Sequence, residues 1–240
     1  MCQFVWADLS TYDIQKSLSF YQSVFDWRFE DVNGYFVARK SNREIAGLYE
    51  TPDFFKKIRM PHFWMSYVAV ENALKTAELA AKFVDAKVEL TSEFYGGDIA
   101  LIRDPQGAGF TVYDGGKLNG RHINEANSLC WNELHVSDAK NVIPFYEKLF
   151  DWIFNYDAAS SSYQVIAGDK QHVADIKQIP NAIKGKYEYW VCSFNVADLE
   201  LTKRKILQNG GGVVTDEGHR MMVHDGSLEA FFYIQSNSEL

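Results

Sequence analysis

The sequence predicts an α+β fold built from four βαβββ units arranged as two tandem domains. The first observation behind this prediction is a repeat: residues 6–29 return as residues 131–154 at a constant, gapless offset of 125. A repeat of this length indicates that one structural unit is used twice. The second observation is the order of hydrophobic patterns, because each half of the chain contains a strand, a helix and three further strands twice over.

The two copies share aromatic, acidic and apolar positions. The matched positions are Trp6 with Trp131, Asp8 with Glu133, Leu9 with Leu134, Asp13 with Asp138, Phe20-Tyr21 with Phe145-Tyr146, and Phe25-Asp26-Trp27 with Phe150-Asp151-Trp152. The last of these triplets is expected to combine packing with a turn or cap. A stretch rich in glycine and polar residues, 116–127, is predicted to be a linker. The predicted domains are therefore residues 1–115 and 128–240, each long enough to bury a core.

In the first domain, apolar and polar residues alternate from residue 2 to 9, which predicts a strand with two different faces. Asp13 precedes apolar residues at helical spacing and predicts a helix start. Asn33-Gly34 is typical of a hairpin turn. After a loop at residues 51–61 the same order begins again. The strands expected in this domain are residues 2–9, 27–32, 35–39, 44–49, 63–70, 87–92, 98–102 and 109–113.

The remaining helices follow the same rules. Asn72 is predicted to cap a helix, whose inward face would carry Leu74, Ala77, Ala81 and Val84. In the second domain a helix is expected over residues 138–150. Pro144 falls inside it, so this helix either begins late, with Pro144 in its first turn, or bends there. A last helix should begin after Asp198 and end near Gly210. The strands expected in the second domain are residues 129–136, 152–156, 162–167, 172–176, 187–196, 213–215, 220–224 and 230–234.

Composition excludes several classes of function. The net charge of −8 argues against a surface for nucleic acid or anionic membranes, because both need clustered Lys and Arg. No apolar run approaches the roughly 18–20 residues that span a bilayer, and the first residues lack the pattern of a signal peptide. Three cysteines without metal spacing, Cys2, Cys130 and Cys192, indicate a reducing compartment and small buried side chains. We therefore expect a cytoplasmic protein.

Four such units in series resemble the vicinal oxygen chelate superfamily, which includes glyoxalase I, bleomycin-resistance proteins, fosfomycin-resistance enzymes and extradiol dioxygenases. The resemblance rests on FYxxxFDW after the first strand of each domain and on DPxGA before the last strand of the first domain. It covers nearly the whole chain and is closest to tandem two-domain glyoxalase-like proteins whose halves open with W-x-[DE]-L. It implies that the paired units of each domain curl into a half-barrel around a cleft.

Enzymes of this superfamily usually bind a divalent metal, which acts as a Lewis acid on two neighbouring substrate oxygens. In the first domain the resemblance places the metal-ligand positions on Trp6, Gly47 or Leu48, Met65, and Thr111. In the second domain it places them on Trp131, a stretch around Ala174, Val191, and Phe232 or a neighbour. Imidazole and carboxylate, the usual ligands, are absent there. Glu133 and His135 share a strand face, but two ligands do not make a metal site. We therefore expect no metal and no cofactor.

The opening strands offer a different constellation. Trp6 and Asp8 share one strand face because they are two residues apart, and so do Trp131 and Glu133. A carboxylate beside an indole in a cleft is partly desolvated, so it could act as a general base or bind a cationic or hydroxylated ligand.

Each of these features also has a structural interpretation. The carboxylates could tie down backbone amides or an arginine such as Arg39 or Arg103. The tryptophans are either stacking platforms for a planar ligand or simple core.

The candidate site residues lead to three hypotheses of function. The first is a metal-free protein that binds a small aromatic or hydrophobic molecule, or a metal-free lyase or isomerase that uses Asp8 or Glu133 as catalytic base. The second is a metal-dependent lyase, isomerase or dioxygenase with displaced ligands, and the third is a non-catalytic scaffold. A monomer and a homodimer both remain open. The candidate ligand-binding residues are Trp6, Asp8, Met65, Thr111, Trp131 and Glu133.

Overall fold

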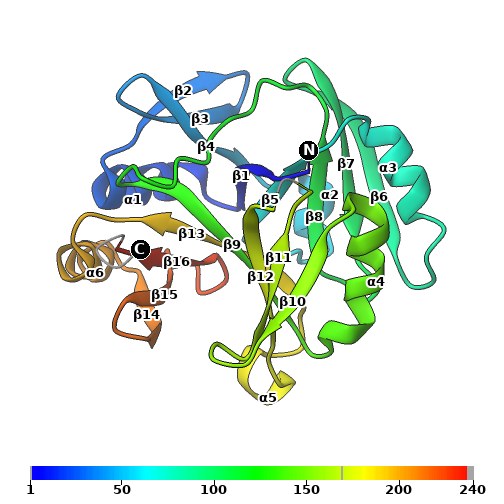
Figure 1. Ribbon diagram of the computed structural model, residues 1–240. Helices are drawn as coiled ribbons and strands as arrows, with labels where there is room; N and C mark the ends of the chain where they lie inside the picture. Colours follow the sequence, from blue (N-terminus) through cyan, green and yellow to red (C-terminus); the bar gives the residue numbers. More distant parts are fainter. Residues whose placement is uncertain (1, 169, 237–240) are drawn as a thin grey trace. The chain divides into compact units, whose positions relative to one another are not determined.

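The computed structural model describes residues 2–168 and 170–236 and has an α+β architecture with two mixed sheets of eight strands each (Figure 1). The first sheet contains, in spatial order, β2 (Arg28–Val32), β3 (Tyr35–Lys40), β4 (Arg43–Glu50), β1 (Phe4–Thr11), β5 (Phe63–Ala69), β8 (Gly109–Tyr113), β7 (Gly97–Arg103) and β6 (Lys87–Phe94). The second sheet contains β10 (Ile153–Asp157), β11 (Ser162–Ile166), β12 (His172–Gln178), β9 (Ser128–Val136), β13 (Tyr189–Asn195), β16 (Phe231–Gln235), β15 (Arg220–His224) and β14 (Gly212–Asp216). The helices of the described residues are α1 (Ile14–Phe25), α2 (Asp53–Lys57), α3 (Ala73–Ala80), α4 (Ala139–Phe150), α5 (Asn181–Lys184) and α6 (Leu199–Gln208).

Both sheets follow the same plan. The opening strand of each half of the chain runs parallel to the fourth strand, as the Cα pairs Asp8–Gly47 and Glu133–Asp175 show. The flanking strands pair antiparallel in both sheets. The predicted fold class of four βαβββ units in two tandem sets is therefore confirmed. The short helix α2 is an addition, because its segment was expected to be a loop.

Packing groups the chain into two compact lobes, and each lobe takes segments from both halves of the sequence. Lobe 1 comprises Met1–Val5, Ser66–Leu118 and Asn132–Val191, and lobe 2 comprises Trp6–Met65, Asn119–Trp131 and Cys192–Leu240. The sequence repeat and the packing unit therefore have different boundaries.

In lobe 1, helices α3 and α4 contact each other (Figure 1). Helix α3 packs on β6, β7 and β8, and helix α4 packs on β10 and β12. Phe4, near the start of the chain, joins this core, with its ring centroid 4.8 Å from that of Trp190 and 5.8 Å from that of Trp152. The Trp152 indole Nε1 donates to the backbone oxygen of Cys2 at 2.9 Å, so the FDW triplet of the second copy anchors the first residues of the chain.

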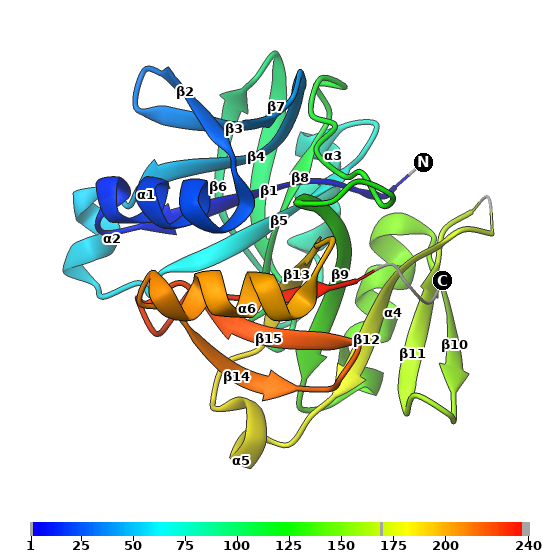
Figure 2. The ribbon, with the colours of Figure 1, turned by 90° about the vertical axis from the view of Figure 1, so that its left-hand side faces the viewer.

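In lobe 2, helices α1 and α6 contact each other in the same way (Figure 2). Their shared core is aromatic, and Trp27 is fully buried in it. The Trp27 Nε1 donates to the backbone oxygen of Asn127 at 2.8 Å, so the triplet of the first copy anchors the segment that precedes β9. The aromatic residues of this core are Phe20, Tyr21, Phe25, Trp27, Trp64, Phe194 and Phe232.

The tyrosine of each FY pair joins two distant segments inside its lobe. In lobe 2 the Tyr21 hydroxyl accepts from Trp64 Nε1 at 3.0 Å and donates to Asp225 Oδ2 at 3.2 Å. In lobe 1 the Tyr146 hydroxyl accepts from Trp190 Nε1 at 2.9 Å and donates to Asp104 Oδ2 at 3.0 Å. The FYxxxFDW pattern therefore specifies a buried hydrogen-bond network as well as apolar packing.

The predicted caps are confirmed. The side chains of Asp13, Asn72 and Asp198 each accept from a backbone N–H of the first helical turn, as N-cap residues do. Asp26 and Asp151 end α1 and α4 in the left-handed conformation, with φ of 59° and 53°. Asp26 and Asp151 thus have the capping role expected of the FDW triplets.

Two expectations about the helices need correction. Helix α3 buries Ala73, Ala77 and Ala80, so the predicted face is right at Ala77 and wrong elsewhere, with Leu74 42% and Val84 82% exposed. The helix ends at Ala80, so Val84 lies beyond it and never joins its face. Pro144 lies inside α4, past the first turn, so the late-start interpretation is wrong.

Within the described part of the chain, no helix has the length and apolarity that a membrane span requires.

Candidate functional site

The paired Trp6 and Asp8 lie on β1, on the strand face opposite Ala7 and Leu9, which pack into the core of lobe 2. Both are buried, at 0% and 2% exposure. The Trp6 Nε1 donates to the Tyr35 hydroxyl at 2.9 Å, and this hydroxyl donates to Asp8 Oδ2 at 3.4 Å. Burial and the charge of Asp8 raise the pKa of Tyr35 well above its usual value, so Tyr35 stays a donor at neutral pH.

Two glycines allow this arrangement. A Cβ on Gly47 would lie 1.7 Å from the Tyr35 hydroxyl oxygen. A Cβ on Gly120, in the predicted linker, would lie 2.3 Å from the backbone oxygen of Ile45 and 2.7 Å from Cε3 of Trp6. Tyr35 and the linker therefore enclose the Trp6 indole, which favours the core interpretation of this tryptophan.

The two arginines that could have held the carboxylates have other partners. Arg39 pairs with Glu30 and Glu44, and Arg103 pairs with Glu89.

Trp131, the counterpart of Trp6, is half-buried and lies under a cation. The guanidinium carbon of Arg121 is 5.0 Å from the centroid of the Trp131 ring, within the range of a cation–π contact. Arg121 Nε also donates to the backbone oxygen of Cys130 at 3.1 Å. Burial lowers the pKa of Arg121 to about 10, which leaves it charged at neutral pH. One face of Trp131 is therefore covered by the protein's own Arg121.

Glu133, the counterpart of Asp8, forms a buried polar cluster in lobe 1. Glu133 Oε1 lies 2.6 Å from His135 Nε2, and both side chains are only 2% exposed. His135 Nδ1 lies 3.3 Å from the Tyr189 hydroxyl, and Glu133 Oε2 lies 3.5 Å from Lys177 Nζ. The sequence placed Glu133 and His135 on one face but gave no sign of Tyr189 and Lys177, which come from β13 and β12.

The chemistry of this cluster follows from its hydrogen bonds. A carboxylate only accepts, so His135 Nε2 carries the proton toward Glu133, and Nδ1 is left to accept from the Tyr189 hydroxyl. Burial, then the charges of Glu133 and Glu188, raise the pKa of Tyr189 to about 12, so this phenol is protonated at neutral pH. The order Tyr189–His135–Glu133 lets the imidazole take a proton from the tyrosine while the carboxylate stabilises the resulting cation.

The other two candidate residues lie apart from these groups. Thr111 is buried on β8 in lobe 1, where its Cα partner is Tyr67. Met65 is half-buried on β5 in lobe 2. The structure thus links Trp6 to Asp8 through Tyr35 and links Glu133 to His135, and no hydrogen bond of the described residues joins Met65 or Thr111 to either group.

The residues at the metal positions implied by the family do not fit a divalent ion. Trp6, Gly47, Met65 and Thr111 supply an indole, no side chain, a thioether and a hydroxyl in the first half, and hard or borderline cations prefer imidazole and carboxylate. In the second half one suitable donor, Asp175, does lie at an implied position, because it pairs with Glu133 as Gly47 pairs with Asp8. The Asp175 carboxylate already has a side-chain partner, since His172 Nε2 lies 2.9 Å from its Oδ1. No cluster of three His, Cys, Asp or Glu residues suited to a metal occurs among the residues described.

These features define a protein of two tandem βαβββ pairs with buried polar clusters on its opening strands. Residues 3–112 match the family model "Glyoxalase/Bleomycin resistance protein/Dioxygenase superfamily". The predicted resemblance is therefore confirmed over residues 3–112, the part of the chain that this family model matches.

Two curated relatives span most of the chain. CFP32 of Mycobacterium tuberculosis, which is named as a glyoxylase, is 25% identical over 88% of this chain and 84% of its own length. The anthracycline biosynthesis protein DauV of a Streptomyces species is 25% identical over 87% of this chain and 82% of its own.

Solved structures share the fold. The 2,3-dioxygenase LapB from Pseudomonas sp. KL28 has a TM-score of 0.64 at 12% identity, covering 99% of this chain and 92% of its own. The Mn(II)-bound glyoxalase from Novosphingobium aromaticivorans has a TM-score of 0.64 at 11% identity, covering 99% of this chain and 82% of its own. At such identities the likeness shows the fold alone.

Proposed function

We propose that this chain is a cytoplasmic glyoxalase-type protein that binds a small organic molecule without a metal, at the Glu133 cluster of lobe 1. The observation that carries the proposal is the buried 2.6 Å contact between Glu133 and His135, which continues to Tyr189. An ionised carboxylate and an imidazole are costly to bury, and such groups concentrate at functional sites. The protein acts on its ligand as a monomer or a homodimer.

The ligand reaches the cluster through its outer members. Tyr189 is half-buried and the Lys177 side chain is 25% exposed, whereas Glu133 and His135 are closed to solvent. The Tyr189 hydroxyl proton points to His135 Nδ1, so the phenol oxygen is left to accept from a ligand hydroxyl, while the Lys177 ammonium donates. The ligand therefore carries a hydroxyl group or a carbonyl oxygen. Names among the relatives support a small molecule as ligand, since they refer to a glyoxylase and to anthracycline biosynthesis.

The enzymatic form of this proposal is a metal-free isomerase or lyase. Tyr189 would exchange a proton with the ligand, and His135 would take or return that proton while Glu133 stabilises the charged imidazole. The recorded hydrogen bond of Asp8 comes from the phenol of Tyr35, whose pKa burial raises well above its usual value, whereas Glu133 contacts an imidazole, which exchanges protons near neutral pH. Glu133 is therefore the better candidate of the two carboxylates.

Tyr189→Phe is expected to weaken ligand binding about fivefold, because it removes one hydrogen bond of roughly 1 kcal/mol and keeps the ring. A panel of carbonyl and hydroxyl compounds is screened by the rise in melting temperature of the unmodified protein, and each hit is then titrated against the variant. Tyr156→Phe, at a tyrosine that is 60% exposed, is the matched control and should bind like the original. Compounds that bind Tyr189→Phe as tightly as Tyr156→Phe would show that the ligand binds away from Tyr189.

Catalysis by the same cluster has a separate readout. With a carbonyl ligand in D₂O, proton NMR should show exchange at the carbon next to the carbonyl, and His135→Gln should abolish it while binding persists. Binding without exchange in the original protein would reduce the proposal to a binding function.

We expect protein purified without chelator to contain no stoichiometric Mn, Fe, Ni or Zn, because the implied positions lack suitable donors. Elemental analysis by mass spectrometry of the intact chain measures this directly. One equivalent of a divalent metal that survives gel filtration would overturn the metal-free proposal and favour a metal-dependent enzyme with displaced ligands.

A further inference from the structure

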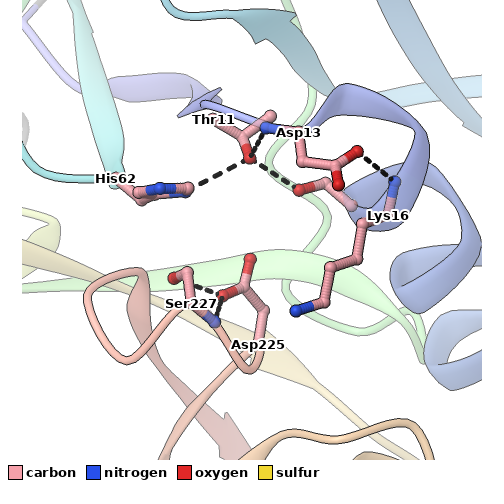
Figure 3. Close-up of a pocket in the computed structure, with 7 residues that line it drawn as sticks. Thr11, Asp13, Lys16, His62, Asp225 and Ser227 are labelled. Carbon is pink, nitrogen blue, oxygen red and sulfur yellow. Dashed lines mark hydrogen bonds between the residues drawn. The ribbon is translucent and has the colours of Figure 1, made fainter. Parts of the chain in front are cut away.

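A pocket of 260 Å³ opens beside the start of α1 in lobe 2, and none of the residues proposed above lines it (Figure 3). Its volume lies just below the usual range for organic ligands, roughly 300–1,000 Å³, so it suits a molecule of few heavy atoms. The residues that line it are Thr11, Asp13, Lys16, Ser17, His62, Asp225 and Ser227.

The inner wall of this pocket is held in place by its own hydrogen bonds. Thr11 Oγ1 lies 2.8 Å from Ser17 Oγ and 3.2 Å from His62 Nδ1. Asp225 Oδ1 accepts from the backbone N–H and the hydroxyl of Ser227, while Oδ2 accepts from Tyr21. The wall is therefore preformed.

Lys16 differs from the hydrogen-bonded side chains of the wall, because no ion pair of the described residues holds its ammonium group. Its side chain extends from α1 toward the Asp225–Ser227 loop (Figure 3). The lining thus offers one ammonium and two carboxylates around a small space.

Lobe 1 contains the corresponding corner, and there a side chain fills it. Tyr146 and Asp104 correspond to Tyr21 and Asp225, since each tyrosine donates to the aspartate of a turn that precedes a closing strand. From the turn at Asp104, Gln106 reaches the start of α4. Its carboxamide oxygen accepts from the Asp138 backbone N–H at 3.1 Å and from Ser137 Oγ at 2.8 Å, and its Nε2 donates to the Asp138 backbone oxygen.

In lobe 2 the residue that corresponds to Gln106 is Ser227. Ser227 follows Asp225 by two residues, as Gln106 follows Asp104, and its short side chain turns back to Asp225 at 2.6 Å. Among the hydrogen bonds of the described residues, the backbone N–H of Asp13, the sequence counterpart of Asp138, donates to Thr11 Oγ1 at a long 3.4 Å, and its backbone oxygen accepts from the Ser17 N–H at 3.1 Å. In lobe 1 the Asp138 backbone oxygen also accepts from the Asn141 N–H, so such a partner does not prevent it from accepting from a carboxamide, and in lobe 2 the equivalent residue, Asp13, lines the pocket.

We infer that the lobe 2 pocket binds a small molecule with a primary carboxamide, which takes the place that the Gln106 side chain takes in lobe 1. A carboxylate would not replace it, because one of its oxygens would face the Asp13 backbone oxygen and both pocket aspartates. A zwitterionic carboxamide such as free glutamine fits best, since Lys16 can hold its carboxylate and the aspartates its ammonium. This inference does not rest on the function proposed for lobe 1.

The test is a titration of ¹⁵N-labelled full-length protein with butyramide, L-glutamine and L-glutamate, followed by two-dimensional NMR. We expect saturable shifts at residues 11–17 and 225–227 for the two carboxamides, and at least tenfold weaker binding of glutamate. Ser227→Gln should close the pocket and abolish these shifts. Lys16→Gln should weaken glutamine about tenfold, as loss of a charge-assisted hydrogen bond does, and leave butyramide unchanged.

Lys140→Gln, in the first turn of α4, is the matched control and should change nothing. Glutamate binding as tightly as glutamine, or shifts that persist in Ser227→Gln, would overturn the inference, as would the absence of any saturable shift for both carboxamides. The Lys16 comparison between glutamine and butyramide decides the question by itself if Ser227→Gln fails to fold. Tyr189→Phe should leave all three titrations unchanged, which separates this site from the lobe 1 proposal.

Discussion

Replacing Trp27 by alanine is expected to lower the free energy of unfolding by about 4 kcal/mol, which is the usual cost of truncating a buried aromatic side chain. Trp27 is fully buried, and its ring centroid lies 4.9 Å from that of Phe25 and 5.4 Å from that of Phe194. Its Nε1 also holds the backbone of Asn127 at 2.8 Å. Urea unfolding followed by circular dichroism measures the change, with the slope against urea checked for constancy.

Two further substitutions make this result interpretable. Trp27→Phe keeps most of the volume and loses the indole donor, so it should cost about half as much. Tyr156→Ala, at an exposed tyrosine, should change stability by no more than about 0.5 kcal/mol. A Trp27→Ala variant as stable as Tyr156→Ala would contradict the view that the FDW triplet anchors the lobe.

The stability of the protein is expected to depend on pH through Asp104. Burial raises the pKa of Asp104 from 3.8 to about 6, although Tyr146 and the backbone N–H groups of residues 106–108 donate to it. The folded state therefore favours the neutral carboxyl. Its contribution is fully present below about pH 4 and is lost as the pH rises to about 6, a loss of about 3 kcal/mol.

Asp104→Asn isolates this effect, because an amide does not titrate and its oxygen still accepts from the turn. Free energies of unfolding measured from pH 4 to 8 should fall less steeply for the variant than for the original protein. The difference between the two profiles should change between pH 4 and 6 and stay constant above pH 7. Parallel profiles over the whole range would show that Asp104 does not titrate in the folded state as described.

The repeat made the fold predictable, because local signals agree with one another in both copies. Asp13 and Asn72 act as caps, and Asn33 and Gly34 adopt φ of 55° and 83° in the expected hairpin turn. The inward face of α3 was mispredicted because the alanines, and not the larger apolar residues, make the close contact. Helix α2 is one turn long and has no buried residue, so hydrophobic periodicity gave no sign of it.

The candidate site was predictable only within a strand. The two-residue spacing placed Glu133 beside His135, and the structure shows that contact. Tyr189, which completes the cluster, lies 54 residues from His135 in the chain and has no motif around it. Tyr35 could not be paired with Trp6 either, because this contact depends on Gly47 leaving room on a neighbouring strand.

The mixed origin of the lobes has a consequence for any attempt to divide the protein. A cut within residues 119–127 would give two fragments, each holding one whole sheet and part of each hydrophobic core. Helix α1 would be separated from α6, and α3 from α4. Each helix would keep its contacts with strands of its own half but would lose its partner helix and the core residues supplied by the other half. We therefore expect the two halves of this polypeptide to depend on each other as the subunits of an obligate dimer do.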